Sequence, residues 1–192
     1  IIPYCRPITE AYDVVVYGSD QIWRVQKALC DYNPEYFADN NINANLHIAF
    51  SASMGVLPKS EEERLKVKRL LSHFNAISVR ETNLLNVVHE LGYNNAVQTI
   101  DPTLLLDAQA WNSTFPTPTY SGEKYILVYI LRPHHFDLNS INRFAEREGL
   151  MVKILTGSAI KAETNQLITT AGPHTFISLV KNADYVFTSS FH

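Results

Sequence analysis

Short apolar runs alternate with amphipathic helical patterns along the chain, and this alternation constrains the fold more than any other feature. Residues 14–17 and 48–50 are rich in β-branched and aromatic side chains, which is typical of strands in a parallel sheet. Ser60 and Glu63 form a capping-box sequence ahead of leucines at helical spacing, which predicts a helix there. Alternating strands and helices predict an α/β fold with parallel strands.

The same rhythm continues to the end of the chain, and residues 14–17 are expected to be buried on both faces of their sheet. The further predicted strands are residues 76–79, 97–100, 125–131, 151–155 and 185–188. The further predicted helices begin at Thr82, Leu138 and Pro173. Residues 114–122 are rich in Pro, Ser and Gly and interrupt this rhythm, which is typical of a linker.

Two lobes are therefore predicted, with an N-terminal Rossmann-like lobe at residues 1–116, a linker at 117–123 and a C-terminal Rossmann-like lobe at 124–192. Both lobes are expected to be incomplete at the chain ends, because the strand at 185–188 has no crossover helix after it.

Composition and charge exclude several classes of protein. The 192 residues carry 16 basic and 19 acidic side chains, a net charge of −3, so there is no basic surplus for binding nucleic acid. No apolar run approaches the roughly 20 residues that cross a membrane, and the first residues of the sequence lack a basic region followed by an apolar stretch. With only two cysteines, we expect a cytoplasmic protein without a disulfide framework, a nucleic-acid partner or a membrane span.

Common catalytic motifs are absent from the sequence. It contains no GxGxxG, no P-loop, no GxSxG and no HExxH, so the usual dinucleotide, phosphate-loop, hydrolase and zinc-protease readings have no support. It also lacks an Asp-x-Asp pair and any cluster of metal-ligating side chains. We therefore expect no metal and no cofactor.

The candidate site residues follow predicted strands, because ligands of open α/β sheets collect at the carboxyl ends of the strands. After residues 14–17, Asp20 could accept a proton from a sugar hydroxyl, or could cap a helix. Trp23 could offer a flat face to a sugar ring or anchor the core. Residues 51–55 are small and would let a ligand approach the backbone, although a polar turn is an alternative.

Three further candidates follow later strands. Arg80 could hold a phosphate or carboxylate, or could pair with Glu81 or another acid. Asp101 stands before Pro102, where an aspartate is more often a helix-entry cap than a catalytic carboxylate. His192 could act as a general acid or base near neutral pH, or could be structural.

The order of these motifs resembles the polysaccharide pyruvyl transferase family over nearly the whole chain. The resemblance is carried by YDVVVYGSDQIW at 12–23, FSASMG at 50–55, SVRE at 78–81, DPTLL at 101–105, Trp111, and NADYVFTSSFH at 182–192. It implies a glycosyltransferase-B-like architecture, with two Rossmann-like lobes around a cleft. It also implies transfer of a pyruvyl group from phosphoenolpyruvate onto two sugar hydroxyls, which forms a ketal in bacterial exopolysaccharide biosynthesis.

The resemblance also implies roles for individual residues. His192 and Asp20 would be catalytic, and phosphoenolpyruvate would be the only co-substrate besides a galactose-type sugar of a polysaccharide or lipid-linked precursor. The donor would contact Arg80, Ser53, Gly55 and Ser190. The acceptor would contact Gln21, Trp23 and Asp101. The chain departs from the family pattern at Ser190, where some members carry arginine.

Two other classes of function fit the same residues. One is a metal-independent glycosyltransferase that uses a nucleotide sugar, and the other is a non-catalytic lobe that binds a glycan or a partner protein. Binding of a nucleotide diphosphate in place of phosphoenolpyruvate would identify the first, and binding of neither would favour the second.

Overall fold

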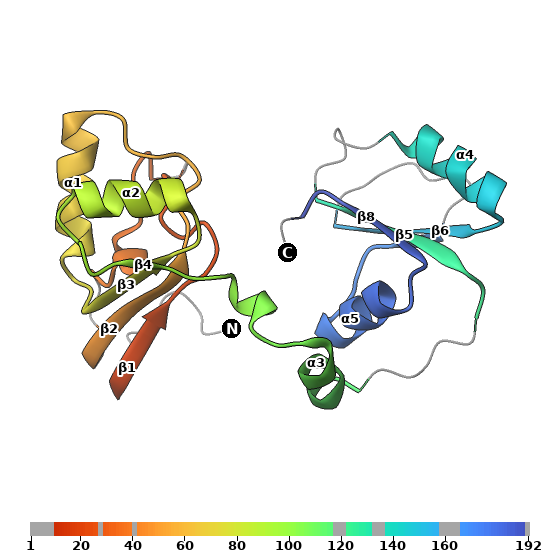
Figure 1. Ribbon diagram of the computed structural model, residues 1–192, viewed down its shortest axis with the longest axis horizontal. Coiled ribbons are helices and arrows are strands. Elements are labelled where there is room, and N and C mark those ends of the chain that lie inside the picture. The colour runs from red at the N-terminus through yellow and green to blue at the C-terminus, as the bar shows by residue number, and fades with distance from the viewer. Residues whose placement is uncertain are drawn as a thin grey trace. The chain divides into compact units, whose positions relative to one another are not determined.

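The structure is a computed structural model that describes residues 10–26, 29–39, 42–116, 122–131, 137–157 and 166–190 (Figure 1). Its internal contacts divide the chain into two compact units, Ile1–Leu105 and Leu106–His192. Most of the predicted linker, residues 117–121, lies outside the described residues, and the lobe boundaries inferred from composition stay a prediction.

The N-terminal unit is built on a parallel sheet with strand order β1-β2-β3-β4. Each crossover steps in the same direction, so the right-handed rule places both connecting helices on one face of the sheet. Side chains of both helices indeed share one buried cluster. The elements are β1 (Ala11–Tyr17), η1 (Pro34–Phe37), β2 (Asn43–Ala52), α1 (Glu61–Leu71), β3 (Ala76–Val79), α2 (Thr82–Glu90), β4 (Val97–Gln98) and η2 (Pro102–Leu104).

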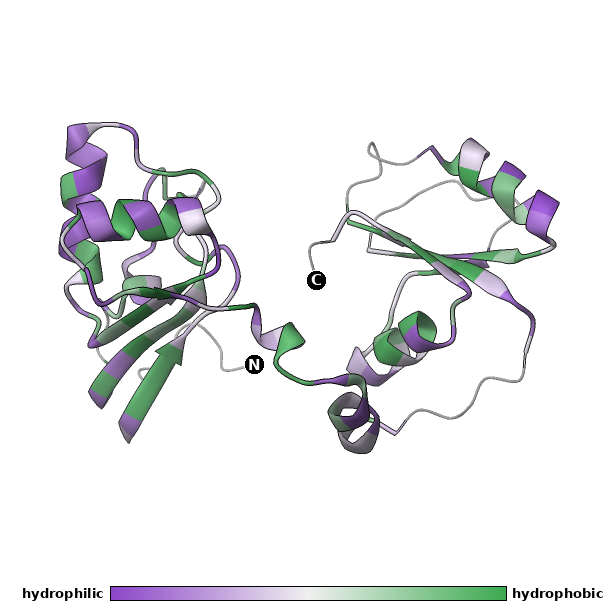
Figure 2. Cartoon of the chain, viewed as in Figure 1, coloured by the Kyte–Doolittle hydropathy of each residue, from purple (hydrophilic) through white to green (hydrophobic). Residues whose placement is uncertain are grey.

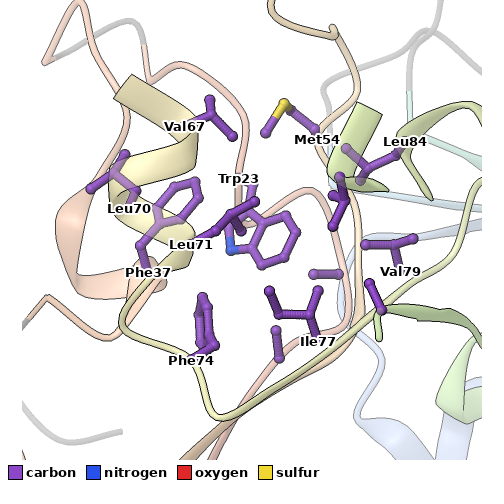
Figure 3. Close-up of a cluster of buried hydrophobic side chains, with 14 of the residues drawn as sticks. Trp23, Phe37, Met54, Val67, Leu70, Leu71, Phe74, Ile77, Val79 and Leu84 are labelled. Atoms are coloured by element: carbon purple, nitrogen blue, oxygen red, sulfur yellow. The ribbon is translucent and has the colours of Figure 1, made fainter. Parts of the chain in front are cut away.

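The core of this unit centres on Trp23, whose side chain has no exposed surface (Figure 3). The indole stacks on Phe37 with ring centroids 5.3 Å apart, and its Nε1 donates a hydrogen bond to the Tyr36 carbonyl at 3.0 Å. Phe74 and Leu71 close the cluster from the end of α1. The segment after β1 is thus anchored by one large buried side chain.

The prediction that residues 14–17 are buried on both faces is wrong. Val15 and Tyr17 pack on the core, whereas Val14 is 42% and Val16 60% exposed. Within the described residues of this unit no helix covers their face, because α1 and α2 both pack on the other face. Figure 2 shows β1 as largely hydrophobic all the same.

A β-bulge interrupts β2 just before the carboxyl end of the sheet. Ala49 pairs with Ile77 but Ala52 pairs with Val79, so β2 has one residue more than β3 over this stretch. Ser51 takes a φ of +50° there. The Ser78 hydroxyl donates to the Ala49 carbonyl and accepts from the Ser51 amide, which fills the gap in the ladder.

The C-terminal unit has a second parallel sheet with strand order β7-β6-β5-β8. The chain steps from β5 through β6 to β7 and then returns to the other side of β5, so its two main helices cover opposite faces. Two separate buried clusters confirm this arrangement. The elements are α3 (Ala108–Thr114), β5 (Tyr125–Ile130), α4 (Leu138–Glu148), β6 (Met151–Thr156), β7 (Gln166–Ile168), α5 (Pro173–Lys181) and β8 (Tyr185–Thr188).

The structure is therefore a mixed α/β protein with two parallel sheets, each consistent with a Rossmann-like lobe. The capping box at Ser60 is confirmed in both directions, with Ser60 and Glu63 each accepting from the other's amide. The strand predicted at 97–100 is confined to Val97–Gln98, and β7 was not predicted. No helix in the described part of the chain is long and apolar enough to span a membrane.

Candidate functional site

The carboxyl ends of β1 to β4 bring the predicted motifs of the N-terminal unit together. The Ser53 amide donates to the Asp20 carbonyl, and the Trp23 amide donates to the Ser53 carbonyl, both at 3.1 Å. The Arg80 amide in turn donates to the Ala52 carbonyl at 3.1 Å. The segments after β1, β2 and β3 are thus joined through their backbones, and the side chains they carry share one edge of the sheet.

Gly18 allows the segment after β1 to lie against β2. A Cβ atom at this position would stand 1.9 Å from the Phe50 carbonyl oxygen, and the glycine has a φ of +153°. Only a residue without a side chain fits such an approach. The next residues, Ser19 and Asp20, are thereby placed beside the ends of β2 and β3.

An ion pair between Arg80 and Asp101 forms the centre of this site. The Arg80 Nη1 lies 2.6 Å from the Asp101 Oδ2, and the two side chains are only 7% and 1% exposed. Ser19 Oγ donates to the same carboxylate oxygen at 3.1 Å. The other oxygen accepts from the Thr103 amide at 3.0 Å and from its hydroxyl at 2.8 Å. Asp101 thus connects the segments after β1, β3 and β4.

These contacts determine the charge state of Asp101. Burial by itself would raise the pKa of the carboxyl group. The hydrogen bonds from Thr103, the Arg80 guanidinium and Ser19 outweigh burial and hold the pKa of Asp101 far below its ordinary value. Asp101 is therefore ionised throughout the physiological range and acts as an acceptor of hydrogen bonds, not as a proton donor.

Two more carboxylates approach the other nitrogens of Arg80. Asp20 Oδ1 lies 3.8 Å from Nη2, and Glu81 Oε1 lies 3.6 Å from Nε. Glu81 also accepts a 2.7 Å hydrogen bond from the buried Ser53 hydroxyl. Three carboxylates around one guanidinium leave two net negative charges. An anion that approaches Arg80 therefore has to overcome the field of Asp20 and Glu81.

Two of the sequence interpretations need correction. Trp23 was interpreted as an acceptor contact, but its indole lies inside the core and presents no face to a ligand. Asp101 was also interpreted as an acceptor contact, but its carboxylate is buried and already accepts from Arg80, Ser19 and Thr103. For both residues the structural alternative, a core anchor and a helix-entry cap, is the observed role.

The remaining predicted contacts of the N-terminal unit are accessible to different degrees. The side chain of Asp20 is 76% exposed, and Gln21 is exposed as well. Gly55 has a φ of +77°, and a Cβ there would come within 3.1 Å of the Gln21 amide nitrogen. Ser53 is buried, and its hydroxyl is directed to Glu81. Of these remaining predicted contacts, Asp20, Gln21 and Gly55 are exposed to a ligand, whereas Ser53 is not.

The predicted residues of the C-terminal unit follow β8. The Ser190 amide donates to the Thr188 hydroxyl at 2.9 Å, and Ser190 is half-buried. His192 lies outside the described residues. The roles of both remain predictions.

The sequence interpretation did not assign Ser19, Glu81 or Thr103 to the site. Thr103 carried a readable signal, because the side chain of an aspartate in a turn commonly accepts a hydrogen bond from the backbone amide two residues further on. The contacts of Ser19 and Glu81 depend on neighbouring strands and have no local signal. Within the described residues, no group of three His, Cys, Asp or Glu side chains could hold a metal ion.

A family model described as polysaccharide pyruvyl transferase matches residues 1–192, the entire sequence. No curated protein and no solved structure matches the chain.

Proposed function

Since the chain belongs to the polysaccharide pyruvyl transferase family, we propose that it transfers a pyruvyl group from phosphoenolpyruvate to two hydroxyls of a sugar. The product is a cyclic ketal on a galactose-type residue of a polysaccharide or its lipid-linked precursor. The proposal includes a glycosyltransferase-B-like architecture for the two parallel sheets. The observation that carries it is the family match over the whole chain.

The reaction requires groups that transfer protons and a cation that stabilises the negative charge of the departing phosphate. A proton adds to the methylene carbon of phosphoenolpyruvate, so that its C2 becomes electrophilic. One sugar hydroxyl adds to C2 and loses its proton, the C2–O bond to phosphate breaks, and the second hydroxyl adds to C2 with loss of its own proton. General acid–base groups and a cation near the phosphate accelerate such steps.

We assign the acceptor side to Asp20. Its carboxylate is exposed, lies beside Gln21 at the carboxyl edge of the sheet, and can take a proton from an incoming hydroxyl. Its backbone is fixed by the hydrogen bond from the Ser53 amide. His192 is assigned proton transfer or phosphate contact on the resemblance alone.

We assign the donor side to Arg80. Asp101 holds the guanidinium in one orientation, which reduces the entropy that a flexible arginine would lose on binding an anion. The anion would approach the Nη2 side, where the exposed Asp20 lies. Because Asp20 and Glu81 oppose that approach, neutralising Asp20 should strengthen donor binding even though it removes the base.

The test is calorimetric titration of the chain with phosphoenolpyruvate and, separately, with a nucleotide diphosphate. A second assay measures phosphate released from phosphoenolpyruvate in the presence of a galactoside. The proposal predicts binding of phosphoenolpyruvate, acceptor-dependent phosphate release, and loss of release in a His192→Asn variant.

Arg80→Lys is the informative variant at the donor side, because it keeps a cation for the buried Asp101 while losing the planar fork. We expect weaker donor binding with native circular dichroism. Binding of the nucleotide but not of phosphoenolpyruvate would overturn the proposal in favour of glycosyl transfer. Binding of neither would favour a non-catalytic lobe.

A further inference from the structure

A cavity of about 380 Å³ lies in the C-terminal unit, and the described residues that line it are different from those assigned above. It is at the carboxyl ends of β5 and β6, beside the first turn of α5, on the face of the sheet that α5 covers. Crevices outside the carboxyl ends of parallel strands are where ligands of α/β proteins bind. A volume of this size is within the range of small-molecule sites.

The topology explains why this cavity exists. Tyr129 pairs with Leu155 across the sheet, so the two side chains point to the same face and form its floor. The chain returns from β7 through α5, which starts at Pro173 next to that floor. Thr156, the last residue of β6, and Thr169, which follows β7, contribute polar groups to the lining.

The lining combines aromatic rings with hydroxyl groups. Tyr129 and Phe176 are in edge-to-face contact, with ring centroids 5.1 Å apart. Among the described residues, the hydroxyls of Tyr129 and Thr169 have no hydrogen-bond partner in the protein. At the start of α5, Pro173 has no N–H and Gly172 supplies no side-chain cap, so the amides of His174 and Thr175 remain available as donors.

The described part of the lining has aromatic, aliphatic and hydroxyl side chains, and this composition favours a neutral ligand. None of the described residues that line the cavity carries a charged side chain. Phosphoenolpyruvate and nucleotide diphosphates are multiply charged and are normally held by Arg, Lys or a metal. A pyranose ring is neutral, with apolar C–H faces that pack on aromatic rings and hydroxyls that pair with protein hydroxyls and amides.

We propose that this cavity, lined by Tyr129, Leu155, Thr156, Thr169, Pro173 and Phe176, binds one neutral pyranose residue of a glycan. The inference does not depend on the proposed reaction. In a polysaccharide enzyme such a subsite would hold the chain by a sugar that does not react. Contacts of that kind are equal in ground and transition states, so they lower KM without changing kcat.

The test uses the full chain without phosphoenolpyruvate, titrated with the methyl glycosides of galactose, glucose and mannose and followed by calorimetry and saturation-transfer NMR. We expect at least one glycoside to bind with a Kd on the order of 1 mM, as is usual for a small neutral ligand. Inorganic phosphate should not displace it. Absence of binding by all three glycosides, or displacement by phosphate, would overturn the proposal.

Gly157→Leu locates the binding, because Gly157 lines the cavity and no atom of the described residues lies within 4 Å of a Cβ built there, so we expect the added side chain to occupy part of the cavity. We expect at least a tenfold loss of glycoside affinity. Tyr129→Phe, which removes one unpaired hydroxyl, should cost about three- to tenfold.

The matched control is Lys181→Leu, which adds the same side chain at the other end of α5. It should leave glycoside affinity unchanged. Glycoside binding that Gly157→Leu does not weaken would refute this location. Because this assay contains no donor, its outcome is independent of whether phosphoenolpyruvate proves to be the substrate.

Discussion

Replacing Asp101 with asparagine should loosen the whole carboxyl edge of the first sheet. The substitution keeps the shape of the side chain and one oxygen for Thr103, but removes the charge that faces Arg80 at 2.6 Å. Because the Arg80 side chain is 7% exposed, its guanidinium would be left buried with less compensation. Breaking a buried pair in this way costs about 3 to 5 kcal/mol, and the retained hydrogen bond places our expectation near the lower figure.

The pH dependence provides a sharper test than the magnitude. The native pKa of Asp101 is lowered, so its contribution to folding is fully present above the unfolded pKa of about 3.9. The contribution is lost as the pH falls below that value toward the native pKa. The stability difference between wild type and Asp101→Asn should therefore be constant between about pH 6 and 8 and should shrink below about pH 4.

The assay is urea denaturation followed by circular dichroism and by tryptophan fluorescence, since Trp23 reports on the core of the same unit. Asp137→Asn serves as the control, because asparagine caps a helix about as well as aspartate and Asp137 is an exposed cap of α4. The Arg80–Asp101 pair does not hold the site together if Asp101→Asn is no less stable than this control. The same conclusion follows if the difference in unfolding free energy between wild type and Asp101→Asn stays unchanged in acid.

Three further predictions concern single substitutions. Gly18→Ala should destabilise the protein by about 2 to 4 kcal/mol, because its Cβ would collide with the Phe50 carbonyl. Gly92 also has a positive φ, but a Cβ there would meet only the Lys68 Nζ at 3.9 Å, so Gly92→Ala should cost about 1 kcal/mol; thermal unfolding compares the two variants. Asp20→Asn should bind phosphoenolpyruvate about two- to fivefold more tightly and release phosphate more slowly, and weaker binding in calorimetry would contradict the charge argument. Ser60→Ala should cost about 1 kcal/mol through loss of the α1 cap, with Ser60→Asp restoring most of it in the same denaturation assay.

Much of the fold could be predicted because its signals are local. The capping box at Ser60 and the apolar run at residues 76–79 gave α1 and β3 where the structure has them. Burial was harder to predict. The run at residues 14–17 has the composition of a doubly covered strand, but which face is covered depends on the direction of crossovers elsewhere in the chain.

The location of the candidate site could be predicted from the sequence, but the ion pairs and hydrogen bonds within it could not. Parallel topology alone brings Asp20, Ser53 and Arg80 to one edge. That Asp101 pairs with Arg80, and is not available to a ligand, depends on the register of β4 against β3, which no motif encodes. Trp23 shows the same limit. An aromatic residue after a strand looks the same in the sequence whether its side chain lies on the surface or, as here, in the core.

The bulge in β2 has a consequence for how this protein can change over evolution. Its extra residue sets on which side of the sheet the following side chains emerge, and Ser53 follows directly after it. Deleting Phe50 or Ser51 would restore a regular ladder but turn Ser53 away from Glu81 and disconnect its backbone from Asp20 and Trp23. Point substitutions at these positions alter one side chain, whereas a change of length by one residue would rearrange the entire edge. We therefore expect related sequences to vary in residue type along β2 far more readily than in the number of residues within β2.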